Sequence, residues 1–143
     1  MHSILHDLWI DAKPIEIFKA ISSPKGLNSW WTKKSDGIPE VGQIYKFYFN
    51  PEYDWRAEVI KSSSPHLIEW KFIKSDEDWN DTVLGFGIIP KDGSSHVKFY
   101  HKGWNSDNDH FRKSCYCWAC YLRLLKRYIE HGEFVPYEHR DSA

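Results

Sequence analysis

The chain lacks an excess of charge of one sign and any long apolar run. Nineteen Lys and Arg residues balance twenty Asp and Glu residues, and the formal net charge is -1. This balance removes the attraction to phosphates that nucleic-acid binding needs. No apolar run approaches the about 20 residues of a membrane-spanning helix, and the opening MHSILHDLWID is too short and polar for a secretion signal. We therefore expect a cytoplasmic protein that neither binds nucleic acid nor inserts into a membrane.

Cysteine is scarce, and all three cysteines, Cys115, Cys117 and Cys120, lie within six residues. An odd number of cysteines without a secretion signal favours free thiols over disulfides. On a helix, Cys115 and Cys117 would point roughly 160° apart, so only Cys117 and Cys120 could share a face. Structural zinc needs four converging ligands, and no second Cys/His pair with a matching spacing is present. We therefore predict ordinary helix cysteines, with no metal and no cofactor.

Aromatic residues are abundant: they make up 17% of the chain, with eight each of Trp, Tyr and Phe. Such side chains carry large apolar area, more than a small core obviously needs. A plain aromatic core is the commoner explanation, and an aromatic-lined cavity is the alternative.

Hydrophobic periodicity predicts one strand, two short helices, a run of strands and a long helix. The first strand is expected at 4–10, and the helices at 12–22, with Pro14 at its first turn, and at 23–31. A polar loop should follow over 32–42. Period-two segments separated by turn residues predict an antiparallel meander with strands at 43–49, 55–62, 67–73, 82–89 and 95–103.

One face of the predicted meander is apolar and the other is charged. The apolar face carries aromatic and aliphatic side chains that include Phe49, Trp55 and Phe99, whereas the other face carries lysines, arginine and glutamates such as Glu69. We expect this second face to be solvated. The final helix is predicted over 109–131, because apolar side chains recur there at spacings of three and four, and Gly132 is expected to end it.

Four stretches of the sequence resemble one family. They are WIDAKPIEIFKAISSP, LNSWW, HVKFYHKGW and CWACYLRLLKRYIEHGE. In this order they are similar to the activator of Hsp90 ATPase homologue 1-like branch of the START-like (SRPBCC) superfamily. The resemblance implies an α+β helix-grip fold, in which an antiparallel sheet of about six strands wraps around a long C-terminal helix, with two short helices after the first strand. It implies one START-like domain over residues 1–135, followed by a polar tail over 136–143. The acidic stretch SDEDWND, residues 75–81, departs from the family pattern.

The resemblance also implies a cavity between the sheet and the long helix. The inward positions make ten residues candidates for its lining, with Trp30 and Trp31 covering the entrance and His101 as a polar anchor. The full set is Trp30, Trp31, Phe47, Trp70, Phe72, Phe86, Phe99, His101, Trp118 and Leu122. Mostly apolar pockets with a few polar anchors suit small apolar or aromatic ligands.

Three functions remain open at this point. The first is a module that binds a small hydrophobic or aromatic ligand. The second is a protein-interaction module related to Hsp90 co-chaperones, with a chaperone or another protein as its partner. The third is a cyclase- or hydratase-like enzyme that uses the cavity as a dry vessel. His101 could act as an acid or base near neutral pH, but no motif for a catalytic nucleophile occurs, and a hydrogen-bonded core histidine is the commoner reading. The sequence does not indicate an oligomeric state.

Overall fold

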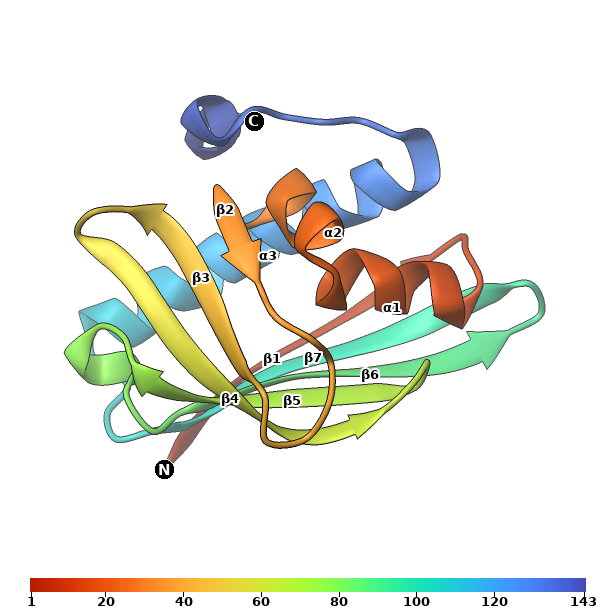
Figure 1. Ribbon diagram of the computed structural model, residues 1–143. Coiled ribbons are helices and arrows are strands. Elements are labelled where there is room, and N and C mark those ends of the chain that lie inside the picture. The colour runs from red at the N-terminus through yellow and green to blue at the C-terminus, as the bar shows by residue number, and fades with distance from the viewer.

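The computed structural model describes residues 1–143, and Figure 1 shows the arrangement of its elements. Seven strands, three α-helices and two 3₁₀-helices follow one another along the chain. They are β1 (His2–Ile10), α1 (Pro14–Ser22), α2 (Pro24–Trp30), β2 (Lys34–Asp36), β3 (Ile44–Asn50), β4 (Tyr53–Ser63), β5 (Leu67–Lys74), η1 (Glu77–Trp79), β6 (Val83–Lys91), β7 (Ser94–Trp104), α3 (Asp109–His131) and η2 (Tyr137–Ser142).

The strands form one antiparallel sheet in the order β1-β7-β6-β5-β4-β3-β2. The meander from β3 to β7 is confirmed, and β1 closes the order by pairing with β7. The sheet has seven strands where about six are expected, because β2 (Lys34–Asp36), within the segment predicted as a loop, pairs with β3. A polar segment of three residues has no apolar alternation, so periodicity could not reveal it.

The three helices lie on one side of the sheet, which curves around them (Figure 1). This arrangement confirms the helix-grip fold. The helix α3 has the predicted bounds, because Asn108 Oδ1 accepts a hydrogen bond from the backbone N–H of Phe111 at its start. Gly132 ends it in the left-handed conformation, with φ of 66°, which costs glycine little. None of the helices combines the length and the apolar character needed to cross a membrane.

The inward face of the sheet carries the core, as its alternation predicts. Side chains such as Phe47, Ala57, Trp70 and Val97 are almost inaccessible to solvent. The opposite face is less uniformly solvated than expected, because Glu69 is only 5% exposed. Tyr100 of β7 reaches across Gly85 of β6, and its hydroxyl donates to Glu69 Oε2.

The C-terminal segment folds back over the helices after α3 (Figure 1). Residues expected only as a polar tail form η2, and Arg140 within it is buried. Its guanidinium donates to three backbone carbonyls, those of Val135 at 2.9 Å, Thr32 at 3.0 Å and Asn28 at 2.7 Å. These bonds attach the end of the chain to the C-terminal end of α2.

Candidate functional site

The middle of the interface between the sheet and α3 is packed with aromatic rings. Trp30 and Phe86 meet edge to face with centroids 6.2 Å apart, and Phe86 and Phe99 meet at 5.3 Å. Trp30 also donates its indole N–H to the carbonyl of Ala20 at 3.0 Å. Six of the ten predicted residues are packed in this way and at most 1% exposed: Trp30, Phe47, Trp70, Phe72, Phe86 and Phe99.

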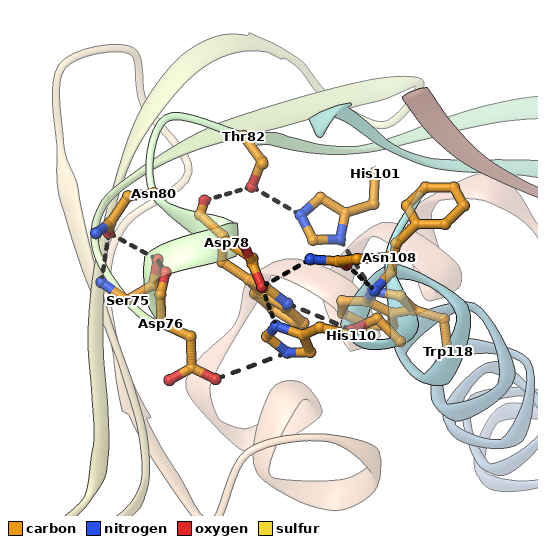
Figure 2. Close-up of polar contacts among 12 residues, drawn as sticks. Ser75, Asp76, Asp78, Asn80, Thr82, His101, Asn108, His110 and Trp118 are labelled. Carbon is orange, nitrogen blue, oxygen red and sulfur yellow. Dashed lines mark hydrogen bonds and ion pairs between the residues drawn. The ribbon is translucent and has the colours of Figure 1, made fainter. Parts of the chain in front are cut away.

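His101 is fully enclosed and uses both ring nitrogens (Figure 2). The indole of Trp118 lies 3.1 Å from Nδ1, and Thr82 Oγ1 lies 2.8 Å from Nε2. Because an indole N–H can only donate, Nδ1 is the acceptor and the ring proton lies on Nε2, which donates to Thr82. The Thr82 hydroxyl in turn donates to the carbonyl of Trp79 at 2.5 Å.

This chain of hydrogen bonds requires a neutral imidazole. Burial, with a smaller contribution from the nearby His110, lowers the pKa of His101 to about 3. His101 is therefore a structural link between β7, α3 and the segment before β6. With neither nitrogen free, it has no proton to exchange with a ligand.

A cleft of about 300 Å³ lies where α3 begins, beside η1 and the β3–β4 turn. Its volume is at the lower end of the range for small-molecule sites. The lining is contributed by six parts of the chain, from the end of α2 to η2. The residues are Trp31, Phe49, Tyr53, Trp55, Asp76, Trp79, His110, Lys113, Ser114, Cys117, Trp118, Tyr121, Tyr137 and Asp141.

Five of these residues form a closed circuit of ring contacts, which we call the aromatic circuit. Its members are Trp31, Phe49, Trp55, Trp79 and Trp118. In that order, successive ring centroids are 5.4, 4.9, 4.6 and 5.8 Å apart, and Trp118 returns to Trp31 at 5.1 Å. Such spacings are typical of favourable aromatic pairs. All five rings also line the cleft.

Asp76 and Asp78 lie close to His110 of α3 (Figure 2), and Asp76 and His110 line the cleft. His110 Nδ1 is 2.9 Å from Asp78 Oδ2, whereas His110 Nε2 is 3.9 Å from Asp76 Oδ2. Asn108 Nδ2 also approaches Asp78, at 3.4 Å. Burial raises the pKa of Asp76, and the like charge of Glu52 adds to this, against the attraction of His110.

The other polar groups of the cleft come from α3 and η2. Burial raises the pKa of the Cys117 thiol, with opposition from Lys113. Burial also raises the pKa of Tyr121 to about 12, and the carboxylate of Asp141 contributes. Cys117 and Tyr121 are therefore protonated at neutral pH, so Cys117 lines the cleft as a neutral thiol.

Only two of the ten predicted residues, Trp31 and Trp118, line this cleft. Leu122 contributes to a separate surface hollow beside β1, and the remaining residues are core. Both Trp30 and Trp31 are buried, and only Trp31 of the two lines the cleft.

Sequence reasoning missed most of the cleft. Alternation along the strands places Phe49 and Trp55 on the inward face, but it does not show that they border an open space near the strand ends. Trp79 stands alone among acidic residues in the stretch 75–81. A single large aromatic residue in so polar a segment was the available signal that the segment turns toward the core. Tyr137 lies in the expected tail and carried no signal.

The model of the family "Activator of Hsp90 ATPase homolog 1-like protein" matches residues 11–130. Among solved structures, the chain is similar to the Aha1 dimer from Colwellia psychrerythraea, with 29% identity, a TM-score of 0.85, and coverage of 93% of this chain and 99% of that one. A Staphylococcus saprophyticus protein has 17% identity and a TM-score of 0.80, with coverage of 94% and 96%. CalU16 from Micromonospora echinospora has 16% identity and a TM-score of 0.75, with coverage of 96% and 83%. The latter two likenesses concern the fold alone. No curated protein matches the chain.

Proposed function

Because the chain belongs to the activator of Hsp90 ATPase homologue 1-like family, we propose that it is a START-like module that binds a small aromatic molecule in the cleft lined by the aromatic circuit. The observation that carries this proposal is the combination of a closed ring of five aromatic side chains with an open volume of about 300 Å³. The ligand occupies the end of the sheet–helix interface, not its packed middle.

The size and chemistry of the cleft restrict the ligand. Aromatic walls favour a flat ring that can stack or meet them edge to face. A volume near the lower limit for small-molecule sites favours a molecule of about one or two rings. Hydrogen-bonding groups such as Ser114 and Tyr121 at the walls orient it.

The test is a titration with 6-propionyl-2-dimethylaminonaphthalene, a neutral two-ring probe whose emission shifts to shorter wavelength in apolar surroundings. We expect saturable binding near one probe per chain. Cys117→Phe places a ring inside the cleft and should weaken binding at least about tenfold, since it fills the space that the probe needs. Cys120→Phe is the matched control, because Cys120 lies one helical turn further on and does not line the cleft.

Absence of saturable binding by the native chain contradicts the proposal. Equal effects of the two cysteine substitutions contradict the location of the site. A second readout is alkylation of Cys117, which should slow when the cleft is occupied, while alkylation of Cys120 should not.

A second candidate function, interaction with a protein partner, is favoured by exposed apolar side chains on β1. Leu5 is 70% exposed and Trp9 is 58% exposed, and β1 lies at one end of the sheet. The family description names an activator of the Hsp90 ATPase. Stimulation of an Hsp90 ATPase that is lost on Trp9→Ser, with probe binding retained, would support this function.

A further inference from the structure

We propose that the aromatic cleft selects ligands that carry a positive charge, such as a quaternary ammonium or protonated amine attached to a single aromatic ring. This inference rests on the proposed function of the cleft as a small-molecule site. It adds a charge preference that an aromatic ligand alone does not require.

The walls of the cleft are suited to a cation. The face of an aromatic ring carries negative potential, and a cation within about 6 Å of the ring centroid is attracted to it. The members of the aromatic circuit are between 2% and 9% exposed, from Trp118 to Trp55. A cation among these buried rings is largely removed from water. Its attraction to the rings is then stronger than at an exposed site.

Asp76 supplies a negative charge at the same place. The imidazole of His110 can donate its Nδ1–H to Asp78, a bond that a neutral ring satisfies, whereas Asp76 Oδ2 lies beyond hydrogen-bond distance from His110 Nε2, at 3.9 Å. Burial raises the pKa of Asp76; of the nearby charges, His110 lowers this pKa, whereas the carboxylates of Glu52 and Asp78, of the same sign, raise it. A second carboxylate of the lining comes from Asp141.

Among the basic groups of the cleft, only His110 lies beside this acidic side. Apart from His110, the only cationic side chain of the lining is Lys113. Its charge acts on Cys117. The guanidinium of Arg140 is directed to three backbone carbonyls.

The acidic stretch 75–81, which the fold alone does not require, brings the indole of Trp79 and the carboxylate of Asp76 to the cleft. The backbone N–H of Trp79 donates to the carbonyl of Asp76 at 2.9 Å. Asn80 Oδ1 accepts a hydrogen bond from the backbone N–H of Ser75 at 2.8 Å. The turn thus holds Trp79 in the aromatic circuit and Asp76 at its edge.

The test compares two probes of equal shape: 3-hydroxyphenyltrimethylammonium, which is cationic, and 3-tert-butylphenol, in which carbon replaces the charged nitrogen. Affinities are measured by calorimetry at a pH below the pKa of both phenols. We expect the cation to bind about tenfold more tightly. Asp76→Asn should weaken binding of the cation about fivefold and leave binding of the neutral probe within about twofold.

The matched control is Asp92→Asn, which removes one negative charge at the β6–β7 turn. Asn is suited to the positive φ of 46° at this position. This variant should bind both probes as the native chain does. Equal or tighter binding of the neutral probe overturns the charge preference while leaving the proposed ligand site intact. An equal effect of Asp76→Asn on both probes also overturns it, and failure of both probes to bind contradicts the proposed function itself.

Discussion

The indole N–H of Trp118 donates to Nδ1 of His101 over 3.1 Å, and this bond fixes the tautomer of a fully buried histidine. The same indole belongs to the aromatic circuit, 5.1 Å from the ring of Trp31. One side chain of α3 thus joins the hydrogen-bonded core to the wall of the cleft. The protonation state of His101 therefore influences the position of the Trp118 indole in the wall of the cleft.

The first prediction concerns pH. The unfolded chain has an ordinary histidine pKa of about 6.5, whereas burial lowers the pKa of folded His101 to about 3. Between these values the unfolded state binds a proton that the folded state does not. The contribution of His101 to the free energy of unfolding is thus constant above the upper value and falls as the pH decreases, by at most about 1.4 kcal/mol per pH unit.

Denaturant unfolding at a series of pH values measures this effect. His101→Gln keeps an acceptor and a donor but removes the titration, so its stability should depend less steeply on acid pH than that of the native chain. His139→Gln, at an exposed position, should keep the native slope. Identical slopes for all three proteins would mean that His101 titrates normally in the folded state.

The second prediction uses two glycines of β6. A Cβ at Gly85 would lie 2.3 Å from the ring of Tyr100, whereas a Cβ at Gly87 meets nothing closer than 3.9 Å. Gly85→Ala should displace the Tyr100 ring from Glu69 and lower the free energy of unfolding by about 1–3 kcal/mol. Gly87→Ala should change it by at most about 0.5 kcal/mol. Thermal or denaturant unfolding of the two variants measures this difference. Equal stabilities would show that the Tyr100 ring does not pack against Gly85.

The third prediction concerns the attachment of the C-terminal segment. Arg140→Met keeps the length of the side chain but leaves three carbonyls without their donors, so the free energy of unfolding should fall by about 1–3 kcal/mol. Hydrogen exchange should rise at the end of α2, near Asn28 and Thr32. Glu138→Gln removes only a surface ion pair with Lys33, at 3.5 Å, and should have little effect. Unchanged exchange in Arg140→Met would show that η2 is held by other contacts.

The fold was largely predictable because its signals are local. The bounds of α3 follow from a cap at Asn108, apolar spacing along one stripe, and a glycine that tolerates positive φ at Gly132. The meander follows from alternation and turn residues. The strand Lys34–Asp36 escaped prediction because its pairing with β3 is its main stabilising feature, and that contact is not encoded within three polar residues.

The cleft was not predictable in the same way, because an inward position does not distinguish a packed ring from one that borders a space. Phe86 and Trp55 both point inward, but Phe86 meets Trp30 from α2, whereas Trp55 lies near the strand end, where η1 and η2 complete the walls. The positions of Trp79 and Tyr137 depend on contacts between segments far apart in the sequence. Such contacts leave no periodic trace.

The last prediction separates the packed middle of the interface from the cleft. Phe86 is 1% exposed and its ring meets Trp30 and Phe99, so the larger ring of Phe86→Trp has no space to enter. This variant should lower the free energy of unfolding by about 1–3 kcal/mol and leave the affinity for 6-propionyl-2-dimethylaminonaphthalene within about twofold, measured where the protein is fully folded. Cys117→Phe should show the opposite pattern, with weakened binding and a smaller loss of stability, because its ring enters open volume. If Phe86→Trp instead abolished probe binding at little cost in stability, the ligand would occupy the middle of the sheet–helix interface, and the cleft would be a surface feature without that role.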